Sequence, residues 1–310
     1  MRPRLLSFLL IAAASGLFSW EGFQNPPQDY GPWNRDLEWS ESADGLVFSK
    51  KGVFVERGGV PSLAKTEDGR LYAVFQWFPL SDRNSFDQVA FMISLDQGRS
   101  WTRPGLIRVS GLTSPLFRVF DPTLAPLPGG GFRLYFSSER TSDLNPRGNR
   151  AIFSAVSDDG IHFTFEPGQR FGFEGGETFD CAVGFLGGFW HLYCPIPASE
   201  GWGYHAISTD GLNFDRQPDV FIPGQRDWLG NVLVTERGIH FFGSGRQGGW
   251  AGFSSDGFRW TLASERTGLG GDPGVVVDED GRYLAVGTGP LRADAKSGPP
   301  IFIKKAIIRR

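Results

Sequence analysis

The stretches Ser157-Asp-Asp-Gly-Ile-His-Phe163 and Ser208-Thr-Asp-Gly-Leu-Asn-Phe214 share one pattern, in which a serine, an aspartate and a glycine precede an aromatic residue. This pattern, called the box here, recurs at residues 42–48, 94–101 and 254–260. The box aspartates lie 52, 63, 51 and 46 residues apart. A repeat of this period indicates stacked supersecondary units, as in a propeller or a solenoid.

The strands around each box are predicted to follow one order. The segment from Asp121 to Phe165 shows it most clearly, because three apolar runs separated by turn residues lead into the box, and a fourth run follows. These runs are residues 121–127, 132–136, 150–156 and 161–165. Four successive strands of this kind form one propeller blade.

The fifth unit begins at Asp272 and has no box after its third run, Ile301–Ile308. The unassigned box at residues 42–48 can supply the missing element, so we expect residues 39–50 to complete this blade and close the ring. The predicted fold is therefore all-β. It is a five-bladed β-propeller over residues 39–310, with four-stranded antiparallel blades and the last blade closed by the N-terminal segment.

The first residues have the order of an export signal. Basic Met1–Arg4 precedes the apolar run Leu5–Ala14 and two small residues. We therefore expect a signal peptide over 1–20 and a linker rich in Pro, Asn, Gln and Gly over 21–38. The expected location is secreted or periplasmic, with no membrane association after signal cleavage.

Composition excludes some classes of partner. The 310 residues carry a formal net charge of -3, and the sequence pI is about 5.9, which argues against nucleic-acid binding. The four histidines have no metal-ligand spacing and no phosphate-binding loop is apparent, so we expect no cofactor. We expect a monomer.

The two cysteines, Cys181 and Cys194, flank a predicted Gly187-Gly188 hairpin turn. If Leu186 pairs with Phe189, counting outward places the two cysteines opposite each other. In an exported protein they could form a disulfide, and the alternative is a pair of buried free thiols.

Candidate chemistry lies where the innermost strand of each blade begins, because these strands converge on the central channel. Asp121, Asp180 and Asp272 open three of the five inner strands, and Glu177 lies close to Asp180 in the sequence. Gathered carboxylates are what glycoside hydrolysis requires, with one as a proton donor and another as a base or nucleophile.

The architecture resembles the Asp-box β-propellers, and five blades point to furanosidase-type glycosidases, the arabinan- and xylan-acting and invertase-like enzymes. The resemblance implies that Asp121 stabilises the transition state and that Asp180 stands at the acid/base position, with Glu177 as the alternative acid. The expected first-blade carboxylate is absent, because that blade opens with Gly59-Val60-Pro61. Asp272 could supply the missing group, or the protein binds sugar without cutting it.

Sialidases are a more distant resemblance, on the stretch Arg57-Gly-Gly-Val60-Pro61, although glycine stands where their clamping arginine belongs. Arg57 and Arg118 are candidate ligands for an anionic group, and surface arginines are the alternative. Trp77 and Trp228 are candidate platforms for a sugar ring. The function classes considered are a carbohydrate-acting hydrolase, a non-catalytic carbohydrate- or protein-binding propeller, and a sialidase-like hydrolase; the boxes themselves are expected to be structural.

Overall fold

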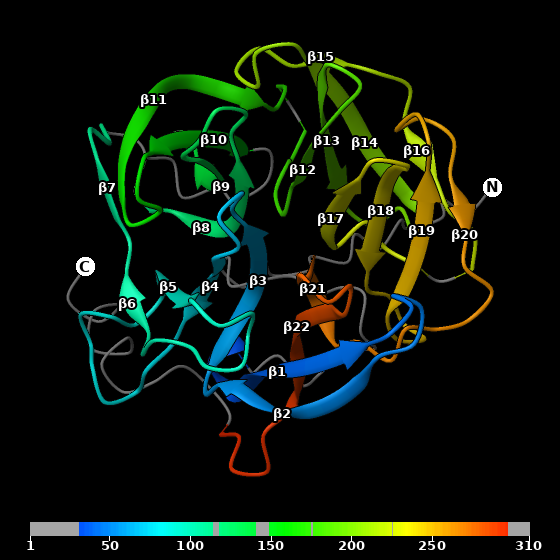
Figure 1. Ribbon diagram of the computed structural model, residues 1–310. Helices are drawn as coiled ribbons and strands as arrows, with labels where there is room; N and C mark the ends of the chain where they lie inside the picture. Colours follow the sequence, from blue (N-terminus) through cyan, green and yellow to red (C-terminus); the bar gives the residue numbers. More distant parts are fainter. Residues whose placement is uncertain (1–30, 114–117, 141–148, 175, 225, 297–310) are drawn as a thin grey trace, which may run out of the picture.

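The computed structural model describes residues 31–113, 118–140, 149–174, 176–224 and 226–296. Five antiparallel sheets stand around a central axis, and the inner strands β3, β8, β12, β17 and β21 lie nearest to it (Figure 1). The protein is an all-β, five-bladed propeller with four-stranded antiparallel blades, so the predicted fold class is confirmed.

Blades 1 to 4 follow one another along the chain. Blade 1 consists of β3 (Gly58–Lys65), β4 (Leu71–Trp77), β5 (Gln88–Ser94) and β6 (Gly105–Leu106). Blade 2 consists of β8 (Phe120–Pro126), β9 (Phe132–Glu139), β10 (Arg150–Ser157) and β11 (His162–Phe171), with β7 (Arg108–Ser110) parallel to β11. Blade 3 consists of β12 (Ala182–Leu186), β13 (Phe189–Pro195), β14 (Trp202–Ser208) and an outer strand in two pieces, β15 (Asp215–Arg216) and β16 (Val220–Phe221), which both pair with β14. Blade 4 consists of β17 (Gly230–Thr235), β18 (Gly238–Gly243), β19 (Trp250–Ser254) and β20 (Thr261–Leu262).

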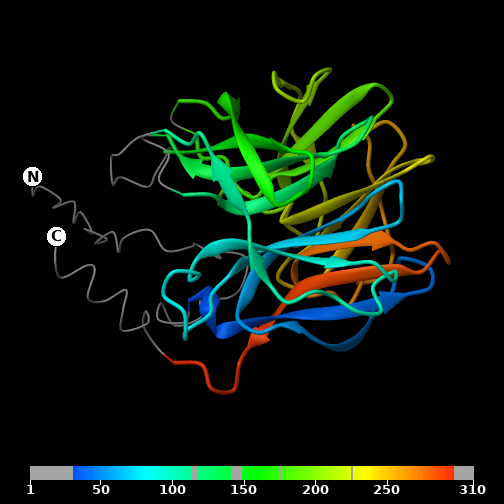
Figure 2. The ribbon, with the colours of Figure 1, turned by 60° about the vertical axis from the view of Figure 1, so that its left-hand side comes forward.

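Blade 5 joins the two ends of the described chain. Its sheet runs in the order β2 (Ser49–Val55), β1 (Arg35–Ser42), β22 (Tyr283–Leu291) and β21 (Gly271–Val277), and β1 lies beside β22 in Figure 2. The N-terminal segment therefore closes the ring, as predicted.

The third strand of blade 5 differs from the prediction. It is β1, where Trp39 pairs with Val286, and not the run Ile301–Ile308, which lies outside the described residues. The short helix η1 (Pro32–Asn34) and the first residues of β1 also fall within the predicted linker. The predicted signal peptide lies outside the described residues.

The hydrophobic core forms a ring of five clusters, one between each pair of neighbouring blades. One cluster joins Tyr72 and Val74 of blade 1 to Leu134 and Phe136 of blade 2, and the others repeat this arrangement around the ring. Because each sheet buries both faces against its neighbours, removing one blade would expose two apolar faces.

The boxes form the turns between the third and fourth strands. In blade 3, Ser208 Oγ donates to Asp210 Oδ1 at 2.8 Å. Asp210 Oδ1 also accepts the backbone N–H groups of Leu212 and Asn213, each at 2.8 Å. These bonds, with that from Asn213 first, lower the pKa of Asp210. The same serine–aspartate hydrogen bond occurs in the other four boxes.

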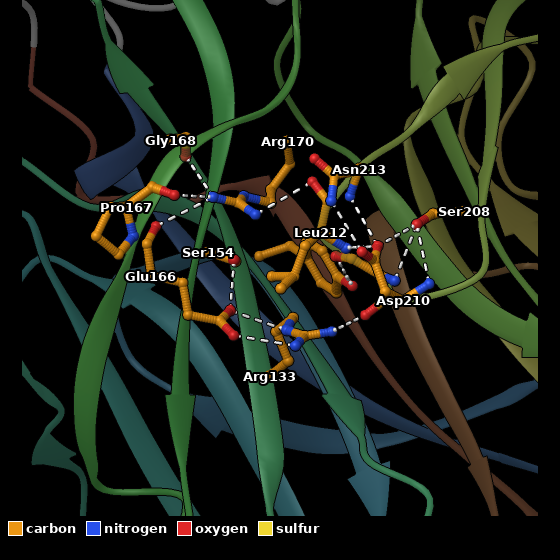
Figure 3. A network of polar contacts seen from close by, with 12 residues as sticks. Arg133, Ser154, Glu166, Pro167, Gly168, Arg170, Ser208, Asp210, Leu212 and Asn213 are labelled. Carbon is orange, nitrogen blue, oxygen red and sulfur yellow. Dashed lines mark hydrogen bonds and ion pairs between the residues drawn. The ribbon is translucent and has the colours of Figure 1, made fainter.

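Each box of blades 3 and 4 also binds the preceding blade. Arg133 of β9 donates to Asp210 O at 3.0 Å, while Glu166 of β11 holds the same guanidinium at 2.8 and 3.0 Å (Figure 3). Tyr193 OH likewise donates to Gly257 O at 2.7 Å. The boxes therefore have a structural role in the packing of neighbouring blades.

Asp210→Ala is expected to lower the free energy of unfolding by about 1–2 kcal/mol, as the loss of a helix cap does, because two backbone N–H groups lose their acceptor. The loss should shrink as the pH falls below about 4, since a carboxyl with a lowered pKa in the folded state stabilises the fold only while ionised. Urea unfolding at two pH values measures both effects. An unchanged midpoint at neutral pH would contradict the structural role.

Among the residues that the structure describes, no helix is long and apolar enough to cross a membrane.

Candidate active site

Four blades share an unusual backbone conformation at or just before the beginning of the inner strand. Val60, Asp121, Asp180 and Asp272 have φ values of 48°, 49°, 49° and 48°. This left-handed region is uncommon for residues other than glycine, and least favourable for β-branched valine. The repetition of one strained conformation in four blades indicates that it serves a shared purpose.

Three of these residues, Val60, Asp121 and Asp272, lie in β-bulges. The pairing of the inner strand with its neighbour shifts between Gly59 and Ser62, between Phe120 and Thr123, and between Gly271 and Gly274. A bulge redirects a side chain away from the regular alternation of a strand. Asp121 and Asp272 therefore depart from the regular alternation of their strands.

Asp121, Asp180 and Asp272 lie close enough together to alter one another's ionisation. Burial raises the pKa of Asp121 to about 6. Burial, with the charge of Asp121 adding to it, raises the pKa of Asp272 to about 7. Burial, followed by the charges of Asp121 and Asp272, raises the pKa of Asp180 well above its ordinary value. The three predicted carboxyls are therefore brought together in a site poor in water.

Three oxygens of Asp121 and Asp180 lack hydrogen-bond partners among the described residues. Both oxygens of Asp121 and Oδ1 of Asp180 are buried without a hydrogen-bond partner in the described part of the chain. Asp121 is only 1% exposed, whereas Asp180 is half-buried. Since buried polar groups are nearly always paired, these oxygens are suited to a ligand or to water.

Three arginines lie near the group, and two of them, Arg118 and Arg150, have carboxylate partners outside it. Arg118 and Arg150 lower the pKa of Asp121, and Arg35 does the same for Asp272. Arg118 is paired with Asp87, and Arg150 Nε lies 2.6 Å from Glu177 Oε1. Glu177 thus lies beside the site, but its carboxylate is engaged by Arg150 and is not a free acid.

Arg118 is the predicted arginine that reaches the carboxyls. Arg57 instead donates to Trp33 O at 2.7 Å and pairs with Asp294 Oδ2 at 3.0 Å, holding together the two ends of the described chain. The sequence did not single out Arg35 or Arg150, because each begins a strand at a position where a charged residue is ordinary.

The predicted aromatic platforms have different environments. Trp228 is 0% exposed and packs against Tyr193, Phe241 and Trp250, so its prediction as a platform is wrong. Trp77, at the end of β4, is half-buried against the core between blades 5 and 1. Trp202, which also lies at a strand end, is by contrast 45% exposed.

The hairpin that carries the cysteines has the predicted register, since Leu186 pairs with Phe189. The disulfide is nevertheless absent, because Cys181 and Cys194 are free and buried. Cys181 precedes the first residue of β12, so the regular cross-strand ladder ends before it. Burial raises the pKa of both thiols above the ordinary value.

A thiol assay with Ellman's reagent is expected to detect no reactive cysteine in the folded protein and both cysteines in denaturant, because thiols this buried are inert. If denaturant without reductant releases no reactive thiol, the two cysteines are joined and the free-thiol state is wrong.

The carboxyls lie at the end of the ring where the inner strands begin, called the site face here. The boxes lie at the other end, because Ser157 pairs with Phe132, which itself pairs with Pro126 at the end of β8. In the described ranges, no group of three His, Cys, Asp or Glu side chains could hold a metal ion.

No family model and no curated protein sequence matches this chain. Solved structures do match it. The family GH43 β-1,3-galactosidase BT3683 has a TM-score of 0.55 at 12% identity, covering 79% of this chain and 94% of that one. A thermostable family-43 glycoside hydrolase gives 0.54 at 14% identity, covering 78% and 96%. Zg3597, a family 117 glycoside hydrolase from Zobellia galactanivorans, gives 0.53 at 14% identity, covering 86% and 93%.

At these identities the likeness shows the fold, which is the five-bladed propeller of these glycoside hydrolases. The predicted resemblance in fold is confirmed.

Proposed function

We propose that the protein is an exported hydrolase that cleaves glycosidic bonds with the carboxyls of Asp121, Asp180 and Asp272. The observation that carries this proposal is the meeting of three inner-strand carboxyls with raised pKa values in a buried site. Glycoside hydrolysis uses one carboxyl that is protonated near neutral pH and another that is ionised.

Asp180 is the proposed general acid. Burial and two carboxyl neighbours raise its pKa, which favours the protonated form that a general acid needs. It is also half-buried, whereas Asp121 is almost fully enclosed. Asp121, beside Arg118 and Arg150, is the proposed anion that stabilises positive charge at the transition state.

Asp272 is the proposed base or nucleophile. Val60 occupies the first-blade position with the same left-handed backbone as the three aspartates, so blade 1 supplies no carboxyl at that point. Asp272, in the neighbouring blade 5, has Arg35 to favour its ionised form.

Hydrolysis is tested with 4-nitrophenyl glycosides and with arabinan, xylan and galactan. The wild-type protein is compared with Asp121→Asn, Asp180→Asn and Asp272→Asn, and the box variant Asp210→Ala is the control for an intact site. We expect activity on at least one substrate, lost in the three site variants and kept in the control. Inactivity of the wild type on every substrate would contradict the proposal.

The second candidate is a non-catalytic propeller that binds carbohydrate through the same face, and the valine at position 60 favours it. It predicts sugar binding without hydrolysis, which Asp180→Asn would leave unchanged. A sialidase-like activity is less supported, since Arg118 and Arg150 already have carboxylate partners.

Export to the periplasm or medium is proposed from the basic and apolar order of residues 1–16, and is tested by the N-terminal mass of the secreted protein. We further propose a monomer whose partner is an oligo- or polysaccharide.

A further inference from the structure

An exposed pair of aromatic rings lies at the edge of blade 3. Trp202 is 45% exposed and Phe221 is 50% exposed, and their ring centroids are 4.8 Å apart at an interplanar angle of 42°. Trp202 opens β14 and pairs with Phe221 at the end of β16. Two large aromatic side chains in contact on an open surface form an apolar patch suited to a ligand.

The backbone holds this pair in place. Trp202 N donates to Ser199 O at 3.0 Å, and Trp202 O accepts the N–H of Ile196 at 3.2 Å. Gly201 O, one residue earlier, accepts both Ile222 N at 2.8 Å and the indole N–H of Trp228 at 3.0 Å. A surface fixed in this way before binding loses little conformational entropy when a ligand arrives.

The pair lies on the site face. Gly203 of β14 pairs with Pro195, the last residue of β13, and Asp180 precedes β12, the next strand inward. Figure 1 shows β12 near the axis and β14 and β16 farther out. The two strand-to-strand steps from β12 to β14 separate the backbone of Trp202 from that of Asp180 by about 10 Å, and Phe221 lies one strand farther out.

The pair also faces the segment that leads to Asp180. Trp202 and Tyr204 project from the same side of β14, since they are two residues apart. The Tyr204 ring lies 5.1 Å from that of Phe173, which follows β11 and precedes Glu177 in the chain. Trp202 therefore projects from the side of β14 on which Tyr204 contacts Phe173, seven residues before Asp180.

We infer that Trp202 and Phe221 form a binding platform for a second sugar ring, so that the ligand is a chain of sugar residues and not a single glycoside. This inference rests on the proposed function of the carboxyl site. The apolar face of a sugar ring packs on an aromatic ring, and a separation of about 10 Å is spanned by an oligosaccharide but not by one sugar unit.

The experiment uses arabinan-, xylan- and galactan-derived oligosaccharides of increasing length, with binding followed by calorimetry. In the wild type, affinity should rise once the chain is long enough to reach the platform. Trp202→Ala and Phe221→Ala should each weaken binding of the long chains by about tenfold, the loss expected for an aromatic anchor. Hydrolysis of the matching 4-nitrophenyl monosaccharide should stay unchanged.

Phe189→Ala is the matched control, because Phe189 is 42% exposed at the opposite end of blade 3 and should leave all binding unchanged. Thermal melting confirms that each variant is folded. Equal affinity for short and long chains, no binding of any oligosaccharide, or equal losses on the monosaccharide and the chains would overturn the inference. Length-dependent binding without hydrolysis would instead reject the hydrolase and keep the platform.

Discussion

Asp180→Asn is expected to lower kcat/KM for glycoside hydrolysis by about a thousandfold, within the range for loss of a general acid. Asparagine has nearly the shape of aspartate but donates no proton to the leaving group. Initial rates on the best substrate from the panel measure the loss. The Asp210→Ala variant, whose substitution lies in a box at the end of the ring opposite the site face, should keep its activity. Full activity in Asp180→Asn would remove this residue from the mechanism.

The same substitution is expected to change stability in a pH-dependent way. A carboxyl whose pKa is raised in the folded protein stabilises it below the ordinary pKa of about 4, and that contribution is lost as the pH rises through the folded-state pKa. The wild type should therefore lose stability relative to Asp180→Asn as the pH rises above about 4, because the pKa of the Asp180 carboxyl is raised in the folded protein. Unfolding of both proteins in urea across this range tests the sign, and a constant difference would contradict it.

Trp228→Ala is expected to lower the free energy of unfolding by about 3–5 kcal/mol, because it leaves a large cavity in the core. The indole is fully buried between blades 3 and 4, where it contacts Tyr193, Phe241 and Trp260 and donates to Gly201 O. Denaturant unfolding measures the loss.

Trp202→Ala removes an indole of the same size from the surface of blade 3, so it is the control and should change stability by less than about 1 kcal/mol. Comparable losses in the two variants would contradict the assignment of Trp228 to the core and Trp202 to the surface.

The repeat made the architecture predictable from the sequence. Serine, aspartate and glycine in each box have fixed tasks in a tight turn, so their spacing reports the spacing of the blades. The hairpin register at Gly187-Gly188 could be counted for the same reason. Closure by the N-terminal segment followed from the unassigned box at residues 42–48.

The third strand of the closing blade was harder to predict, because Arg35–Ser42 is rich in charge and buries only Leu37, Ser40 and Ser42. The apolar run Ile301–Ile308 was the more obvious strand. Yet every box joins a third strand to a fourth, so the strand before residues 42–48 was already the better candidate.

The inner-strand aspartates were recognised as candidates because they share a position, but the sequence does not encode their environment. The pKa values depend on burial and on Arg35 of blade 5, Arg150 of blade 2 and Arg118, which directly precedes blade 2. The aromatic residues show the same limit, since Trp202 and Trp228 both lie near strand ends and only packing separates them. The left-handed conformation of Val60 had no signal in its residue type.

Titration of the side-chain carboxyls by ¹³C NMR, with aspartate labelled and Asp121→Asn, Asp180→Asn and Asp272→Asn used for assignment, tests the central claim most directly. The account predicts a coupled group with apparent pKa values near and above 6, and each substitution should lower those of the remaining two carboxyls. Three independent titrations near the ordinary value of about 4 would contradict a shared, buried carboxyl site.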